Sequence, residues 1–440
     1  MIKLFRRRIL MNTQYRLEDI GKIGLGLLNT IVDPKNFLKE KLERARNFMK
    51  RYGLGAILCL TEPNVAYVTN IPPLGTLSAG VGGYRYAILP EKGEPVYFDE
   101  CDTAYHLAKQ FPYIKVDKSI PLGGVFFSSP PQAQQHMLGL FVEQIRDTLK
   151  ELKLEKEVLG IDTNIPYLLE ALKKGLKGEV SLDGAKALTE ARMVKTPTEQ
   201  RIFRILASVV DGCFEVAYKK IKVGVSEQEV WSEIVKYQVL HGLEPGGYII
   251  SGQHTWPKDV SRSCTDRLFK VGDTVVIDIF NSRLLGYCSC CYRSFSVGPA
   301  PKDVREAYKK AITLLREAEK ALKPGATTKD IVEKWPDEVE LWSKRPPYIR
   351  NEREKFSTFF NNMGHGLGIA TLYDPPFFWR PIAIKWPVKL EAGMVIALET
   401  QEGTPDNRCG VRIEDMIIIT DAGYEIISRW PADEITVVPI

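Results

Sequence analysis

Two apolar runs near the C-terminus each carry a carboxylate, and this pattern constrains the fold more than any other feature of the chain. Glu399 ends the strand-like run 394–398, and Glu414 interrupts the apolar run 411–419. A carboxylate inside a buried strand costs free energy unless it is paired or binds a cation. The pattern predicts strands that present acidic side chains to a cation; the alternative is that each Glu faces solvent.

A glycine-rich histidine motif precedes these runs. His365 is flanked by Gly364, Gly366 and Gly368. Glycines let the backbone approach other chain segments closely, so the motif predicts an imidazole held at the end of a strand or in a turn. A lone histidine in such a turn is usually structural. Its position before the two acidic runs favours a role as a ligand.

A second group of candidate ligands lies upstream, where Asp278 falls in the strand-like segment 273–280 and a hairpin-like segment follows at 286–297. Side chains alternate faces along a strand. If Cys290 faces the same cavity as Asp278, Cys288 should line that cavity and Cys291 should point away. Because zinc sites use separated ligands, the run Cys-Ser-Cys-Cys alone is weak support for metal, and buried inert thiols are the alternative for Cys288 and Cys291.

Composition excludes several classes of protein. The 440 residues are 44% apolar, enough for two domains with separate cores. The 60 basic and 55 acidic residues leave a net charge of +5, which gives no case for a nucleic-acid partner. We expect no membrane segment and a cytoplasmic protein whose eight cysteines are reduced.

The N-terminal half reads as an α/β domain over residues 36–190. An amphipathic helix is expected at 36–52, and two further helices at 137–152 and 165–176. Strand-like runs lie at 56–60, 86–89, 95–98 and 158–162. Residues 1–35 are expected to form an N-terminal extension. The alternative is that Met1 is an upstream start codon and that the protein begins at Met11. The segment 123–135 lacks a period and is expected to be a surface loop.

The second domain is expected over residues 195–440. Thr196, Pro197 and Glu199 have the spacing of a helix N-terminus, and Ser226 with Glu229 repeats the pattern. The remaining pattern is α+β. Helices are expected at 197–221, 227–241, 301–322 and 328–342. Strands are expected at 248–251, 273–280, 286–297, 394–400, 411–420 and 424–428.

Five blocks of this second domain resemble a known superfamily. In order they read GDTVVID, GYCSCCYRSFSVG, GHGLG, LEAGMVIALE and GVRIEDMIIITDAGYEIIS. They are similar to successive blocks of the methionine aminopeptidase, aminopeptidase P, prolidase and creatinase superfamily. The resemblance covers residues 195–440 and implies an α+β catalytic domain of the pita-bread fold. The preceding domain resembles the α/β creatinase/prolidase N-terminal domain.

The resemblance implies a ligand set. Metal-dependent members hold two divalent ions with Asp, Asp, His, Glu and Glu, and these positions fall on Asp278, Cys290, His365, Glu399 and Glu414. Cys290 therefore stands where the second aspartate is expected. The spacing from Asp278 to Cys290 is one residue longer than in the peptidases, as in the branch with dimethylsulfoniopropionate lyase and ectoine-derivative hydrolases. The segment 370–376 also lacks the second histidine of the proline peptidases.

Cys290 leaves three states of the metal site open. Its thiolate binds a borderline ion such as zinc, because thiolates suit zinc better than manganese. Alternatively, His365, Glu399 and Glu414 hold a single ion. In the third case no metal binds, as in creatinase, and acid–base side chains act alone. The expected cofactor is thus one or two divalent ions of zinc, manganese, cobalt or iron.

Three functions follow as hypotheses. The first is a hydrolase of C–N bonds with Xaa-Pro peptidase-like ancestry, in which His365, Glu399 and Glu414 are catalytic. The second is a hydrolase or lyase of a non-peptide small molecule, and the third is a binding module without catalysis. Candidate substrate-binding residues are Arg412, Tyr287 and His254, for which ion pairing or packing is the alternative. The family resemblance also implies a homodimer acting on a dipeptide or small molecule.

Overall fold

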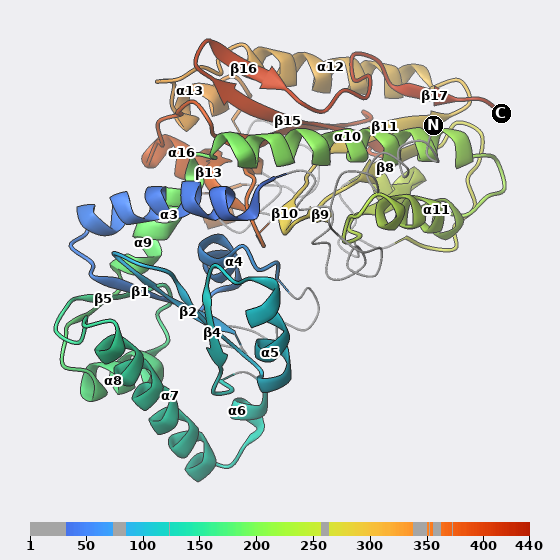
Figure 1. Cartoon of the computed structure of the whole chain (residues 1–440). Helices are drawn as coiled ribbons and strands as arrows, with labels where there is room; N and C mark the ends of the chain where they lie inside the picture. Colours follow the sequence, from blue (N-terminus) through green and yellow to red (C-terminus); the bar gives the residue numbers. More distant parts are fainter. Residues whose placement is uncertain are drawn as a thin grey trace, which may run out of the picture.

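A computed structural model describes residues 32–73, 85–122, 124–256, 264–337, 350–351, 353–354, 362–371 and 373–440. The chain forms two parts in sequence order (Figure 1), an N-terminal part built on one sheet and a C-terminal part built on three. The predicted extension lies almost wholly outside the described residues. No helix in the described ranges has the length and apolar character that crossing a bilayer requires.

The N-terminal part is built on a six-stranded mixed sheet in the order β4-β3-β2-β1-β5-β6. Central β1 is buried on both faces, and its residues alternate between two core clusters: Ile57 and Cys59 in one, Ala56 and Leu58 in the other. Helices therefore cover both faces of this sheet, and the part has the α/β character that the sequence predicted. The strands are Ala56–Cys59, Tyr86–Pro90, Val96–Asp99, Lys115–Lys118, Leu159–Ile161 and Val180–Ser181.

Seven helices of this part are described, numbered α3 to α9: Pro34–Arg51, Glu62–Thr69, Cys101–Gln110, Gly124–Ser128, Pro131–Glu151, Pro166–Gly175 and Asp183–Met193. The prediction of a loop at 123–135 is wrong. This segment forms α6 and the first turn of α7, because Pro131 suits the first helical position and Phe126 is buried in the sheet core.

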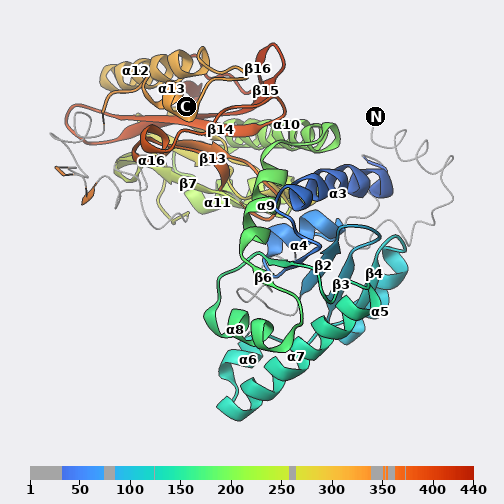
Figure 2. The same ribbon diagram turned by 90° about the vertical axis from the view of Figure 1, so that its left-hand side faces the viewer.

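The two parts meet at α3, α9 and α10, which lie between the two sets of strands (Figure 2). Helix α10 (Pro197–Lys220) begins with the predicted capping box of Thr196 and Glu199, and α11 (Glu227–Leu240) with that of Ser226 and Glu229. One hydrophobic core continues across the seam, because Phe37, Phe203 and Tyr287 belong to the same cluster.

The C-terminal part contains a four-stranded sheet in the order β17-β11-β8-β7, a five-stranded sheet in the order β13-β12-β14-β15-β16, and the small β9–β10 pair. In chain order, β7 to β11 are Tyr248–Ser251, Thr274–Asp278, Arg283–Leu284, Tyr287–Cys288 and Tyr292–Val297. The later strands, β12 to β17, are Asn362–Gly366, Asp374–Trp379, Val395–Gly403, Gly410–Thr420, Gly423–Ile426 and Thr436–Val438.

Helices pack on both faces of the five-stranded sheet. On β14, Val395 and Ala397 lie in the core that contains α10, whereas Ile396 and Leu398 lie in the core that contains α12 (Lys302–Glu319). Figure 1 shows α10 and α12 on opposite sides of β15. Two shorter helices, α13 (Thr328–Val332) and α16 (Arg380–Lys385), are also described in this part.

Two element predictions need correction here. The helix expected at 328–342 ends at Val332 because Pro336 cannot continue it, and residues 338–342 lie outside the described ranges. The segment expected as one strand at 286–297 is broken between Cys288 and Tyr292. Alternation of side chains therefore does not carry across residues 289–291.

Candidate metal and active site

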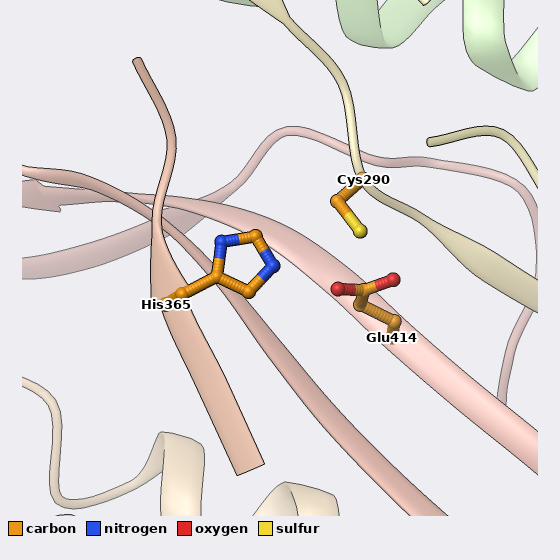
Figure 3. Close-up of side chains that lie close together, drawn as sticks. All are labelled: Cys290, His365 and Glu414. Atoms are coloured by element: carbon orange, nitrogen blue, oxygen red, sulfur yellow. The ribbon is translucent and has the colours of Figure 1, made fainter. Parts of the chain in front are cut away.

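Three ligand-type side chains from separate elements converge in the C-terminal part (Figure 3). The donor atoms of Cys290, His365 and Glu414 all lie within 4.8 Å of one another, and the three residues are buried. Cys290 lies in the break before β11, His365 on β12 and Glu414 on β15. Distant segments thus bring a thiol, an imidazole and a carboxylate to one point.

The glycines on either side of His365 let its strand, β12, lie close to the two neighbouring strands. A Cβ on Gly364 would overlap the carbonyl oxygen of Ala397 on β14, and a Cβ on Gly366 would overlap that of Pro375 on β13. The Nδ1 of His365 lies 2.9 Å from the carbonyl oxygen of Gly366. Because a carbonyl can only accept, Nδ1 carries the proton and Nε2 offers its lone pair, the state that binds metal.

Two more carboxylates lie on the adjoining strands. Glu399 is half-buried and pairs directly with Glu414 across β14 and β15. Side chains of directly opposed residues share a face of the sheet. Asp278, at the end of β8, is buried and pairs with Tyr292. The structure therefore gathers all five predicted ligand positions in one region, with three of them in the tight cluster.

Electrostatics link the five positions. Burial raises the pKa of the Cys290 thiol well above its ordinary value, and the nearby carboxylates of Glu414, Asp278 and Glu399 raise it further. A thiol in this setting stays protonated without a cation, whereas a bound divalent ion favours the thiolate. Imidazole, thiolate and carboxylate are all zinc ligands. The donor set thus fits a divalent cation.

Comparison with known proteins decides the family. Residues 201–421, about half of the chain, match the model of metallopeptidase family M24, and residues 41–194 match the creatinase/prolidase N-terminal domain. The chain belongs to metallopeptidase family M24. This assignment confirms the resemblance seen in the sequence blocks, and with it the expected architecture of an α/β creatinase-type domain followed by an α+β pita-bread domain.

Individual relatives of this M24 protein are distant. The chain is 25% identical to the Xaa-Pro dipeptidase of Pyrococcus horikoshii over 402 residues, which cover 90% of this chain and 98% of that protein. The uncharacterized peptidase YqhT of Bacillus subtilis is 25% identical over 400 residues, 89% of this chain and 99% of that protein. The structure of an Xaa-Pro dipeptidase from Bacillus anthracis has a TM-score of 0.68 at 23% identity, over 91% of this chain and 99% of that one.

Arg412 lies on the same strand as Glu414 in the M24 domain. It is 2% exposed, and its guanidinium carbon is 5.9 Å from the centre of the Tyr292 ring. Within the described part of the chain, its Nε and Nη2 atoms have no hydrogen-bond acceptor. Since residues two apart on a strand share a face, Arg412 presents spare donors on the face that carries Glu414.

The opposite face of β15 is held by arginines. Asp415 accepts from Nη2 of Arg293 at 2.7 Å and from Nη1 of Arg316 at 2.7 Å. Arg293 also donates to the backbone carbonyl of Glu414. Although burial raises the pKa of Asp415, the two arginines bring it below its ordinary value. This ionic cluster fixes the strand that carries Glu414.

Two predicted substrate-binding residues, Tyr287 and His254, are not among the three clustered donors. Tyr287 donates its hydroxyl proton to Oε1 of Glu199 at 2.9 Å, and its ring packs against Phe37 and Phe203 at the domain seam. His254 is half-exposed in the 3-10 helix η3 (Gly252–Thr255), which follows β7. Neither residue therefore belongs to the cluster of Cys290, His365 and Glu414.

Both cysteines flanking Cys290 are buried thiols outside the three-donor cluster, which agrees with one of the two interpretations given for them. The prediction that Cys288 lines the ligand cavity is wrong: its thiol lies 3.4 Å from Oδ1 of Asn281. The reason is the break in the strand, which interrupts the alternation of faces. Cys291 faces the backbone carbonyl of Glu414 at 3.1 Å. Cys290 is thus the cysteine of this run that joins the candidate metal site.

The sequence reasoning missed two residues beside the site. The ring of Tyr373 lies 4.5 Å from that of His365, centre to centre, in an edge-on arrangement. The next residue, Asp374, is buried and pairs with Arg192 across the domain seam at 3.0 Å. Both follow the GHGLG motif, where the sequence showed an absent histidine but no sign of what replaces it.

Proposed function

We propose that this M24 protein hydrolyses a C–N bond in a small zwitterionic substrate by activating water in the cavity of Asp278, Cys290, His365, Glu399 and Glu414. The observation that carries the proposal is the convergence of Cys290, His365 and Glu414, with two further carboxylates on the adjoining strands. Family M24 membership supports peptidase-like ancestry.

Cys290, His365 and Glu414 would hold a divalent ion, and the thiol favours zinc over manganese. When bound, such an ion supplies water of lowered pKa and stabilises the developing oxyanion. The proton on Nδ1 of His365 keeps Nε2 available as a donor atom. Asp278 and Glu399 add carboxylates for a more extended ligand set.

Glu399 is the best candidate for the general base. It is half-buried, whereas its partner Glu414 is fully buried, so Glu399 is the carboxylate that water reaches more easily. In the proposed reaction it accepts the proton of the attacking water and returns it to the leaving nitrogen. Glu399→Gln keeps the shape of this side chain and removes its basicity.

Arg412 gives the reason for a zwitterionic substrate. Its spare guanidinium donors are buried on the face of Glu414, where a carboxylate of the substrate would pair with them. A dipeptide carries such a carboxylate, and the Pyrococcus horikoshii relative is named Xaa-Pro dipeptidase. His254 and Tyr287 are proposed to act at most indirectly on substrate.

A second candidate function is that of a hydrolase or lyase acting on a non-peptide zwitterion. The observation that favours it lies beside His365, where Tyr373 occupies the segment that in proline peptidases carries a second histidine. Without that imidazole, protonation of a peptide leaving group falls to fewer side chains. A ligand of this kind still needs Arg412 for its carboxylate.

The test is a metal analysis of the purified protein, followed by turnover assays with zinc, manganese, cobalt or iron. Xaa-Pro dipeptides and guanidino, ectoine-like and sulfonio compounds form the substrate panel, with Glu399→Gln as the inactive control. Bound zinc with turnover of a dipeptide supports the first function, and turnover of the other compounds alone supports the second. Absence of both metal and turnover contradicts the proposal and leaves a binding module. Light scattering would check the predicted homodimer.

A further inference from the structure

A chain of buried polar side chains crosses the domain seam and ends against the histidine turn. It runs from Asp162 through Asn64 and Arg192 to Asp374. The first three residues belong to the N-terminal part, and Asp374 begins β13 beside the GHGLG motif. All four side chains are at least nine-tenths buried.

The N-terminal end of this chain is firmly anchored. Asp162 accepts hydrogen bonds from the backbone nitrogens of Leu60 (2.8 Å) and Thr61 (3.0 Å), from the Thr61 hydroxyl (2.6 Å) and from Nδ2 of Asn64 (2.8 Å). These four donors satisfy both carboxylate oxygens. With its nitrogen bound to Asp162, Asn64 turns its oxygen toward Arg192.

Arg192 forms the centre of the chain. Its Nη1 donates to Oδ1 of Asn64, and its Nη2 donates to Oδ1 of Asp374 at 3.0 Å. Lys195 lies farther from Asp374, with 3.8 Å between Nζ and Oδ2. A buried charge that loses its partner is strongly destabilising, so the fold favours the geometry in which Arg192 holds Asp374.

At the end near the candidate site, Asp374 contacts the turn that follows His365. Its backbone pairs with Gly366 in the β12–β13 ladder, and a Cβ on Gly368 would lie 2.5 Å from its Oδ2. The carbonyl of Gly368 accepts from the backbone nitrogen of Cys288 at 3.0 Å, two residues before Cys290. One carboxylate thus touches the turn that carries His365 and, through Gly368, the segment that carries Cys290.

We propose that Arg192 is a positioning residue of the metal site. By holding Asp374 against Gly368, it sets the separation of His365 and Cys290, so the N-terminal domain completes the site from a distance. The inference rests on the proposed function insofar as those two residues bind metal. Other contacts at the seam have no link to the histidine turn. The Thr198 hydroxyl, for example, donates to Oε1 of Glu40 at 2.9 Å.

The experiment compares Arg192→Gln, Arg192→Lys and Asn64→Ala with the seam control Thr198→Ala. Zinc affinity is measured by competition with a chelator, and the cobalt–thiolate absorption band reports Cys290 directly. We expect Arg192→Gln to weaken zinc binding about tenfold or more. Arg192→Lys should restore part of the loss, Asn64→Ala should give a smaller loss, and Thr198→Ala should leave affinity unchanged.

Hydrogen exchange in the metal-free proteins tests the same inference without metal or substrate. Arg192→Gln should speed exchange in the peptide spanning 362–371, and Thr198→Ala should not. Wild-type exchange and affinity in Arg192→Gln would overturn the inference while leaving the proposed function intact. If the wild-type protein binds none of the divalent ions tested and shows no turnover, the proposed function fails, and the exchange comparison still decides whether Arg192 positions the turn. Should Arg192→Gln not fold, Asn64→Ala provides both readouts.

Discussion

The two faces of β15 treat neighbouring carboxylates in opposite ways. Asp415 faces α12 and pairs with Arg293 and Arg316, each at 2.7 Å. Glu414 faces Cys290, His365 and a second carboxylate on β14. Both acids are buried, yet one is neutralised by cations of the chain and the other lies among further acidic groups. The contrast separates a carboxylate that stabilises the fold from one suited to an external cation.

The strongest test of this contrast is Glu414→Gln. We expect turnover to fall by at least about 10³-fold, because a ligand is lost from the reacting centre. Bound zinc should fall with it, while the melting temperature of the metal-free protein should not drop, since a buried acid is removed. Steady-state kinetics, metal analysis and calorimetry measure the three quantities. Full activity in this variant would contradict the role assigned to Glu414.

On the other face, Arg293→Met should cost stability. Removing one partner of a buried ion pair destabilises a protein by about 3–5 kcal/mol, and here Asp415 keeps Arg316 as a second partner, so the loss should lie at the lower end. Urea unfolding measures it. The matched control is Arg204→Met, which removes an exposed pair with Glu425 and should cost less than about 1 kcal/mol. Equal losses would show that the buried cluster is not special.

Cys290→Asp sharpens the comparison on the ligand face. A carboxylate at this position should lower zinc affinity by about tenfold and allow manganese to support turnover, since manganese prefers oxygen ligands. Isothermal titration with each ion, with Cys288→Asp as the neighbouring control, measures the change. Unaltered ion preference would mean that the Cys290 thiol does not contact the metal.

The smallest expected effect concerns Glu319, which faces Asp415 from α12. Burial and the charge of Asp415 raise the pKa of Glu319 from 4.5 to about 8. Its folded pKa exceeds its unfolded pKa, so the stability it contributes is complete below pH 4.5 and lost as pH rises through about 8.

Glu319→Gln should therefore flatten this pH dependence. The melting temperature of the wild-type protein should fall by a few degrees between pH 6 and pH 9, and that of the variant should fall less. Glu317→Gln, on the exposed side of the same helix, serves as the control because Glu317 pairs at the surface with Lys320. Parallel curves for wild type and Glu319→Gln would contradict the assignment.

Local signals in the sequence predicted most helices and strands. The capping boxes at Thr196 and Ser226 and the apolar run of β15 involve residues close together in the chain, and the structure confirms them. The break at 289–291 has no such local signal. Ser289 and Cys291 bond to the facing segment 279–282, whereas the backbone nitrogen of the preceding Cys288 bonds to Gly368, a distant partner that the hairpin sequence does not reveal.

The candidate site shows the same division. The family resemblance indicated the five ligand positions, and the structure brings them together. Arg192 and Asp374 are separated by 182 residues, and neither stands out in its own segment. A link of this kind arises from the packing of two domains, so it could not be predicted from one sequence.

The packing of the strands, and not catalysis, requires the glycines around His365. Side chains at Gly364 and Gly366 would overlap carbonyl oxygens of the strands on either side, whether or not the imidazole is present. A descendant that had lost catalysis would still be under selection to keep both glycines. Their presence in a pseudoenzyme would therefore reflect the architecture of the sheet, and loss of chemistry would have to be sought at the five proposed ligand positions.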